Sequence, residues 1–326
     1  MNAVTHHYAD VNGIRLHYAE QGEGPLVVLL HGYIECWYSW HRQFGPLAEA
    51  GYRVVAPDLR GVGRSEAPKD VEQYTLLHRT GDVVGLINAL GQERAVVVGH
   101  DFGAPVAWAT ALVRPDLVRG VAGMSVPPSM TPLHIGETHP FAAARAAFGD
   151  DFYWLYILRP GVADAELDAD LHRTFRNQLY RGAGENPRNN PPTPWTVLRD
   201  TGLIEPVDDP DELPAWLTED DIDTFAAEYE TNGFTGSLNW YRNIDRDWEL
   251  MAPWSDAAIQ PPSLFISGDR DRVSAIGGNV ARVLDELPAY LPDLRGTLVL
   301  PGCGHWTQME RPTEVNAALL EFLAEL

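Results

Sequence analysis

Residues 95–107, with the sequence AVVVGHDFGAPVA, decide the fold class. The apolar run 95–98 predicts a buried strand, and residues 104–107 begin a helical pattern. Between the two, a glycine stands two residues before and two residues after Asp101. Small residues are needed at such places because a sharp strand-to-helix turn brings its backbone close to its neighbours. The stretch therefore predicts a strand, a tight turn and a helix, with Asp101 presented at the turn.

Comparable patterns recur along the first part of the chain. Apolar and polar side chains alternate over residues 14–20, which predicts a half-buried edge strand. Continuous apolar runs predict strands covered on both faces at 26–30, 53–57, 95–99 and 120–126. Helical periodicity lies between these runs, at 40–50, 76–90 and 104–114. The alternation predicts an α/β fold with a mostly parallel sheet.

The pattern changes between residues 127 and 255, where helical periodicity continues without a clear strand. Thr218 and Asp221 resemble a capping box at the start of one helix. One face of another helix is predicted by the four-residue spacing of Leu167, Leu171, Phe175 and Leu179. Strand and helix patterns then resume at 263–267, at 297–300 and from Pro312. We therefore expect a core domain formed by residues 1–126 and 256–326, with a helical cap inserted over residues 127–255.

Composition excludes several classes of function. Among 326 residues, 46 Asp and Glu outnumber 24 Lys and Arg, which gives a formal net charge of −22. Such an excess repels phosphate backbones and anionic membrane surfaces, so we expect no nucleic-acid or membrane partner. The only lysine is Lys69, so no Gly-Lys-Ser/Thr phosphate loop exists.

Cysteine usage and the N-terminal residues bear on the compartment. Residues 1–13 are polar, and no apolar run is long enough to cross a bilayer, so we expect neither a secretory signal nor a membrane segment. Cys36 and Cys303 are too few for a disulfide framework or a metal-ligand cluster. We expect a soluble, cytoplasmic protein without a metal, and a homo-oligomer is compatible with the sequence.

Asp101 is the candidate nucleophile. A carboxylate at this turn is suited to displacing a leaving group from saturated carbon and forming an ester, whereas a serine would give acyl transfer. Asp271 and His305 each follow a later predicted strand. We expect His305 to deprotonate a water and Asp271 to orient the imidazole ring. Asp269 is the alternative acid.

A loop after another strand supplies candidate oxyanion donors. His31, Gly32 and Tyr33 follow the predicted strand 26–30. In a hydrolase arrangement the backbone N–H groups of Tyr33 and Phe102 would form the oxyanion hole. Gly32 allows the close approach that such a loop needs.

Five stretches resemble the soluble-type epoxide hydrolases of the α/β-hydrolase superfamily. They are HGYIE at 31–35 with WYSW at 37–40, DLRGVGRS at 58–65, GHDFGA at 99–104, GSLNWYRN at 236–243 and GCGHWTQ at 302–308. The likeness extends from about residue 8 to residue 323, and the last two stretches are more similar to epoxide hydrolases than to other hydrolases of this fold. The resemblance implies an α/β-hydrolase fold with an inserted cap.

The resemblance also implies two cap tyrosines that bind the epoxide oxygen. The second family tyrosine falls on Tyr241 and the first on Tyr153, with Tyr156 as the alternative. Neutral phenols can hydrogen-bond the alkoxide that forms as the ring opens, and one can donate a proton. The implied reaction opens an epoxide to a vicinal diol through an ester on Asp101. The partners are the epoxide and water, and no cofactor is required.

One position departs from the family pattern. Ile34 stands where the family usually has a proline that follows a cis bond. A cis bond before isoleucine would cost about 3 kcal/mol, against well under 1 before proline. We expect the loop to keep its function because Gly32 and Glu35 keep their places. Comparing Ile34→Pro with the wild type tests whether this position is tuned.

Two alternative functions remain to be compared with this one. Haloalkane dehalogenases share the Asp nucleophile and the His, but usually have Trp where this chain has Phe102 and often have Asn where it has Tyr33. An inactive hydrolase-fold protein that only binds ligands would be expected to lose members of the triad, and all are present here. Epoxide hydrolysis is therefore the preferred hypothesis.

Aromatic residues in the expected cap suggest the character of the substrate. Six of the ten tryptophans lie within residues 127–255. Trp37, Trp154 and Trp240 neighbour motif residues and are our candidates for the pocket wall. An aromatic pocket over a carboxylate favours an apolar or bulky epoxide.

Overall fold

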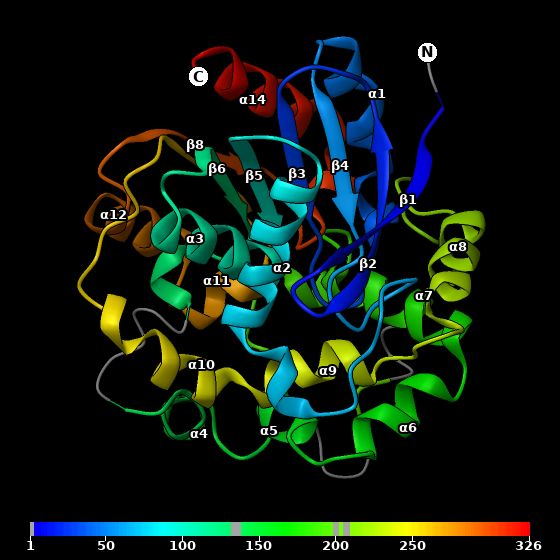
Figure 1. Ribbon diagram of the computed structural model, residues 1–326. Coiled ribbons are helices and arrows are strands. Elements are labelled where there is room, and N and C mark those ends of the chain that lie inside the picture. The colour runs from blue at the N-terminus through cyan, green and yellow to red at the C-terminus, as the bar shows by residue number, and fades with distance from the viewer. Residues whose placement is uncertain (1–2, 132–137, 198–201, 205–208) are drawn as a thin grey trace.

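The computed structural model describes residues 3–131, 138–197, 202–204 and 209–326, and its framework is one eight-stranded sheet (Figure 1). The strand order is β1-β2-β4-β3-β5-β6-β7-β8. The strands are β1 (Thr5–Val11), β2 (Ile14–Gln21), β3 (Leu26–Leu30), β4 (Arg53–Pro57), β5 (Ala95–His100), β6 (Val118–Met124), β7 (Ser263–Gly268) and β8 (Leu294–Leu300). β2 is antiparallel to β1 and β4, and the other neighbours pair in parallel. The predicted mostly parallel α/β fold is confirmed.

The sheet corrects one expectation. Residues 14–20 were predicted to form the edge strand, but β2 lies between β1 and β4, and β1 is the edge. β1 has the sequence THHYADV, and most of its side chains are exposed. Because both of its faces carry polar groups, no apolar alternation marks it as a strand.

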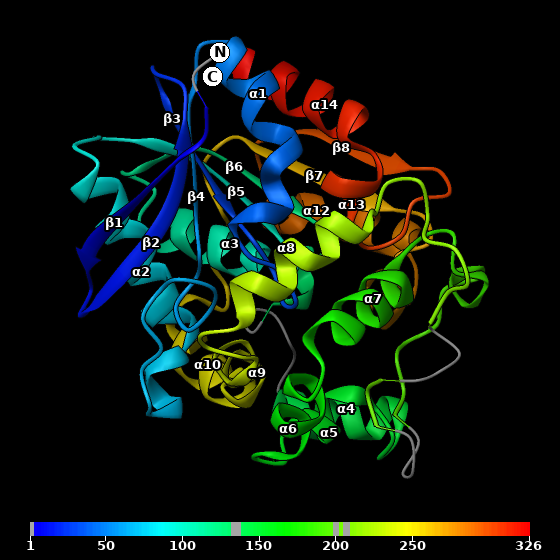
Figure 2. The same cartoon turned by 90° about the vertical axis from the view of Figure 1, so that its right-hand side faces the viewer.

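Helices cover both faces of the sheet. They are α1 (His41–Glu49), α2 (Leu76–Ala89), α3 (Gly103–Val113), α11 (Arg272–Ile276), α12 (Val280–Tyr290), α13 (Thr307–Glu310) and α14 (Pro312–Ala324). α2 and α3 pack against each other on one face, whereas α1 and α14 pack together on the opposite face (Figure 2). This two-sided cover explains why the central strands consist of continuous apolar runs.

Between β6 and β7 the described residues form helices and loops, which we call the helical block. Its α-helices are α4 (Pro140–Phe148), α5 (Tyr153–Ile157), α6 (Val162–Asp168), α7 (Leu171–Gly182), α8 (Glu219–Tyr229), α9 (Thr235–Arg242) and α10 (Ile244–Met251). In the described part of the block, β-pairing is limited to an isolated bridge between Phe152 and Thr196. Several of these helices lie below the lower ends of the strands in Figure 1.

Two predictions about helices in the block have different outcomes. Thr218 and Asp221 form the predicted capping box at the start of α8. The helix face predicted over residues 167–179 holds for Leu171, Phe175 and Leu179, which share α7, but not for Leu167, because one helix ends and another begins between α6 and α7. Asp170 begins α7 by accepting a hydrogen bond from the Arg173 N–H, and such a cap starts a new helix.

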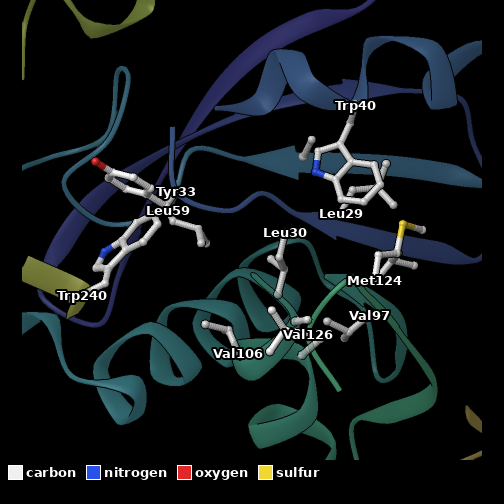
Figure 3. Packing of buried hydrophobic residues seen from close by; sticks show 14 of the residues in the cluster. Leu29, Leu30, Tyr33, Trp40, Leu59, Val97, Val106, Met124, Val126 and Trp240 are labelled. Atoms are coloured by element: carbon white, nitrogen blue, oxygen red, sulfur yellow. The ribbon is translucent and has the colours of Figure 1, made fainter. Parts of the chain in front are cut away.

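One continuous core joins the sheet to the helical block. Figure 3 shows Leu29 and Leu30 of β3, Val97 of β5, Met124 of β6 and Val106 of α3 among the side chains of this core. These side chains are fully buried. Trp240 of α9 belongs to the same buried cluster, so the block is packed onto the sheet rather than tethered to it. None of the described helices is long and apolar enough to cross a membrane.

Candidate active site

Asp101 lies at the turn between β5 and α3, in the left-handed region with φ of 49°. Only glycine fits at the two flanking positions, because neighbouring backbone leaves no room for a side chain there. A Cβ on Gly99 would lie 2.1 Å from the Gly103 carbonyl oxygen, and one on Gly103 would lie 2.1 Å from that of Leu30. A left-handed non-glycine residue costs about 1–3 kcal/mol, which the packing around the turn must offset. The tight turn therefore holds the Asp101 side chain in a fixed place.

A histidine and a second carboxylate stand in line with Asp101. His305 Nε2 lies 3.4 Å from Asp101 Oδ2, and His305 Nδ1 lies 3.0 Å from Asp271 Oδ1. All three side chains come from loops or turns that follow parallel strands, where open α/β sheets gather their functional groups. The alternative acid, Asp269, is exposed and accepts a hydrogen bond from the Gly302 N–H instead. The geometry thus pairs His305 with Asp271.

Electrostatics set the charge of this group. Burial lowers the pKa of His305, but the Asp271 and Asp101 carboxylates outweigh burial and raise it well above the ordinary value. Burial raises the pKa of Asp101, and the hydrogen bond and charge of His305 outweigh that effect and lower it. Asp101 is therefore an anion at neutral pH, as a nucleophile requires.

The loop after β3 brings a backbone donor to Asp101. The Tyr33 N–H donates to Asp101 Oδ1 at 2.7 Å. Phe102 precedes the first residue of α3, where backbone N–H groups have no partner within the helix. A Cβ on Gly32 would lie 2.4 Å from the Cβ of Asp101, so only glycine allows this approach. Both N–H groups expected to bind an oxyanion thus lie in the segments that meet at Asp101.

Ile34 adopts an unusual conformation in this loop. Asn190–Pro191 is the cis peptide bond found in the described residues, so the bond before Ile34 is trans. The φ angle of Ile34 is 62°, a left-handed value that β-branched residues rarely adopt. Its side chain is buried. The departure from proline is therefore accommodated by a left-handed trans residue.

Glu35 connects this loop to the loop that carries His305. Its carboxylate accepts hydrogen bonds from the Gly32 N–H at 2.5 Å and from Gln308 at 2.6 Å, and lies 2.7 Å from His100 Nδ1. His100 Nε2 in turn lies 2.8 Å from the His305 carbonyl oxygen. The network therefore fixes the two loops relative to each other.

Glu310, which the sequence analysis did not single out, holds the histidine loop from the other side. Its carboxylate accepts hydrogen bonds from the N–H groups of Gly304 at 2.8 Å, Trp306 at 3.1 Å and Gly184 at 3.0 Å. Burial raises its pKa to about 7 even though these donors oppose the shift. Its position, on a short helix directly after His305, is the sequence signal that could have identified it.

The helical block places two phenols opposite Asp101. Tyr153 begins α5 and Tyr241 lies in α9, and their ring centroids are 5.8 Å apart. Burial raises the pKa of both tyrosines, and the charge of Asp101 adds to the increase. Both are therefore neutral hydrogen-bond donors at neutral pH. The alternative, Tyr156, donates to Glu166 at 2.7 Å and is only partly buried.

Two cavities meet at Asp101 and Tyr153, since both residues line each of them. The first has an empty volume of about 600 Å³, including space open to solvent, and the second about 430 Å³. The first is mostly apolar; its other lining residues are Leu76, Arg79, Phe102, Pro105, Val126, Met130, Trp154, Ile244, Asp247, Val273 and Ile276. The second contains Tyr33, Ile34, Ile157, Gln178, Arg181, Trp195, Leu203, Tyr241, His305 and Trp306. A molecule held at Asp101 would extend into one or both.

The three tryptophans expected at the pocket wall have different places. Trp154 lines the first cavity, but Trp37 and Trp240 line neither. Trp240 is fully buried beneath the wall, 5.8 Å from the Phe102 ring, and its Nε1 donates to the Arg60 carbonyl. Trp37 packs instead against the rings of His6, Tyr38 and Phe44. Trp195, which the sequence analysis did not choose, stands 6.0 Å from the His305 ring.

Known proteins share this arrangement of the chain. A family model described as the alpha/beta hydrolase fold matches residues 25–154. Epoxide hydrolase A of Mycobacterium tuberculosis is 42% identical over 331 residues, covering 100% of this chain and 99% of that protein. Epoxide hydrolase 3 of Siraitia grosvenorii is 39% identical, covering 99% of each.

Solved structures give the same result. The crystal structure of epoxide hydrolase A from Mycobacterium thermoresistibile superimposes with a TM-score of 0.89 at 42% identity, covering 99% of this chain and 98% of that one. An epoxide hydrolase from Vigna radiata gives 0.89 at 35% identity, with the same coverage. Identity at this level over the full length of both chains is enough to assign the family. The chain therefore belongs to the epoxide hydrolases of the α/β-hydrolase fold.

Proposed function

We propose that this epoxide hydrolase works through a covalent ester on Asp101, which water then hydrolyses. One observation carries the proposal. An anionic carboxylate lies 2.7 Å from a backbone donor and 3.4 Å from a histidine, and it lines the second cavity together with two neutral phenols. A nucleophile, a base and proton donors are thus gathered around one space, as covalent catalysis requires.

In the first half of the reaction, one oxygen of Asp101 attacks an epoxide carbon. The bond from that carbon to the epoxide oxygen breaks, and its electron pair stays on the oxygen. Tyr153 and Tyr241 donate hydrogen bonds to the forming alkoxide, and one of them transfers its proton. Phenols suit this task because burial raises their pKa and keeps them protonated until the alkoxide forms.

In the second half, water cleaves the ester. Esterification removes the charge of Asp101, and with it one of the carboxylates that raise the pKa of His305. The ring can then pass its proton to the phenolate left by the first half and take one from water. The hydroxide attacks the carbonyl carbon of the ester, and the N–H groups of Tyr33 and Phe102 stabilise the oxyanion. The bond to the alkyl oxygen breaks as that oxygen takes the proton brought by the hydroxide, which releases the diol and restores the Asp101 carboxylate. His305 keeps the proton taken from water and is again an imidazolium.

The helical block acts as a cap in this proposal and defines the substrate. It contributes both phenols, and the first cavity that it covers is lined mainly by Leu, Val, Ile, Met and aromatic side chains. Apolar walls remove water from the reacting carboxylate and bind apolar substituents. We therefore infer that the enzyme prefers epoxides with an apolar or bulky substituent.

The His305→Gln variant tests the covalent route. Without a base, the ester should accumulate, so intact mass after mixing with an epoxide should increase by the mass of the substrate. Peptide mapping should place the added mass on the peptide that contains Asp101. The matched Asp101→Asn variant should gain none. The route is wrong if His305→Gln forms no adduct while it still binds the epoxide. Halide release from haloalkanes, measured on the wild type, would instead indicate dehalogenase activity.

A further inference from the structure

A buried ion pair lines the first cavity beside the reacting groups. Arg79 of α2 and Asp247 of α10 both belong to its wall. Arg79 Nη2 lies 3.3 Å from Asp247 Oδ2, and the two side chains are only 2% and 1% exposed. Every other lining residue of this cavity except Asp101 is apolar or aromatic. The pair is therefore a polar spot on an otherwise apolar wall.

Two nitrogens of the Arg79 guanidinium have no hydrogen-bond acceptor among the described residues. Its Nε and Nη1 are buried and have no hydrogen-bond partner in the part of the chain that the structure describes. The neighbouring pair, formed by Asp82 of the same helix and Arg60 of the loop after β4, differs in this respect. Arg60 donates from Nε at 2.9 Å and from Nη2 at 2.6 Å to Asp82, and from Nη2 at 3.2 Å to the Asn12 carbonyl. A buried donor without an acceptor costs about 1–3 kcal/mol, so Arg79 gains from any acceptor that reaches it.

The Phe102 ring lies between Arg79 and the phenol of Tyr241. Its Cζ lies 5.6 Å from the centre of the Phe102 ring and 5.4 Å from that of Trp240. The Phe102 ring in turn lies 4.5 Å from that of Tyr241. A substituent that runs from the epoxide along Phe102 would therefore reach the guanidinium.

The chemistry of the pair selects the kind of acceptor. Asp247 already balances the charge of Arg79, and its Oδ1 accepts the Leu76 N–H at 2.6 Å. A second carboxylate would have to be desolvated beside Asp247 and would be repelled by it. An uncharged oxygen, such as that of an ether, a carbonyl or a hydroxyl group, can accept from the guanidinium without that cost.

We propose that Arg79 is a specificity-determining residue that binds an uncharged oxygen acceptor of the substrate, located beyond an apolar segment that follows the epoxide. This inference rests on the proposed function and narrows its substrate class. The preferred substrate is an epoxide with an apolar body and an oxygen acceptor along it, rather than a pure hydrocarbon epoxide or one that ends in a carboxylate.

The experiment uses three 1,2-epoxides of matched chain length that end in a methyl, a methoxy or a carboxylate group. The wild type should have the highest kcat/KM for the methoxy compound. In the double variant Arg79→Leu/Asp247→Asn, the ratio of kcat/KM for methoxy over methyl should fall about tenfold, the value of one hydrogen bond to a charged donor. The change should appear mainly in KM, because the contact is remote from the reacting atoms.

The matched control removes the buried ion pair between Asp82 of α2 and Arg60. Arg60→Leu/Asp82→Asn eliminates a buried pair that lines neither cavity, so it should leave the methoxy-to-methyl ratio unchanged. An equal fall in this control would mean that the effect is structural, and an unchanged ratio in the Arg79 variant would overturn the proposal. If the Arg79 variant does not fold, the wild type alone tests the proposal. A higher kcat/KM for the methyl or the carboxylate compound than for the methoxy compound overturns it. If no epoxide is hydrolysed at all, the proposed function fails instead.

Discussion

The two sides of Asp101 are built in different ways. On the side of the sheet, loops and turns that follow strands supply charged or backbone groups: the Tyr33 N–H at 2.7 Å, and His305 held 3.0 Å from Asp271. On the side of the helical block, helices supply the neutral phenols of Tyr153 and Tyr241. The difference suggests a division of labour, in which the sheet side handles the carboxylate and its ester while the block side handles the epoxide oxygen. Variants that act on one side only can test this division.

The largest effect is expected from Asp271→Asn, on the sheet side. An amide no longer stabilises the imidazolium or selects the correct tautomer, so ester hydrolysis should slow by about 10³–10⁴-fold. Ester formation should be affected much less, and the adduct should accumulate during turnover. Rapid-quench mass spectrometry measures both steps. The control is Asp269→Asn, which changes the exposed carboxylate two residues earlier and should leave both rates near those of the wild type. Equal losses in the two variants would contradict the assignment of Asp271.

Removal of the phenol hydroxyls should produce the opposite kinetic pattern. Tyr153→Phe and Tyr241→Phe should each slow ester formation by about 10–100-fold, and the double variant by about 10³-fold, because the alkoxide loses its donors. Hydrolysis of an ester that has already formed should be little changed, so no adduct should accumulate. Tyr156→Phe is the matched control, since its hydroxyl bonds Glu166 rather than facing the other two phenols. Adduct accumulation in the double variant would place the phenols in the second half instead.

The charge of the sheet side should also affect stability as pH changes. The pKa of His305 is raised in the folded protein above its unfolded value of about 6.5. Its contribution to the free energy of unfolding is therefore fully present below about pH 6.5 and is lost as the pH increases through the folded pKa. Urea unfolding of the wild type and of His305→Gln should show a difference that shrinks as the pH increases above 6.5. A difference that grows with pH would mean that the folded protein holds His305 neutral.

The sheet side was also the more predictable from sequence. Spacing and strand ends alone indicated Asp101, His305 and Asp271, with Asp269 left as the alternative acid, because a parallel sheet gathers its carboxyl ends at one edge. Tyr153 and Tyr241 depended on the resemblance, since no local pattern distinguishes a cavity-facing tyrosine on a helix from a packed one. The cost of a cis bond before isoleucine left a trans bond at Ile34 as one of two alternatives. Neither argument predicted its left-handed φ of 62°.

The position of Arg79 on its helix is a signal that the sequence already contains. The buried positions of α2 follow a helical spacing that includes Leu76, Thr80 and Val83, and Arg79 falls on the same face. A charged residue on an apolar helix face is a signal of a buried pair or a polar site. Its partner, Asp247, lies 168 positions away in the chain, and only the packing of α10 against α2 brings the two together.

The smallest expected effect tests whether the helical block can be weakened without touching the chemistry. Thr218 Oγ1 accepts the Asp221 N–H at 3.1 Å, and Asp221 accepts the Thr218 N–H at 2.9 Å. Thr218→Ala should lower the free energy of unfolding by about 1 kcal/mol through loss of the cap, with kcat/KM unchanged while the protein is folded. Thr224→Ala, within the same helix, removes a hydroxyl that donates to the Asp220 carbonyl and caps no helix end, so it should change stability by less than about 0.5 kcal/mol. If Thr218→Ala lowers kcat/KM, the start of α8 is coupled to the site, and the block side is less independent of the sheet side than its separate hydrogen bonds imply.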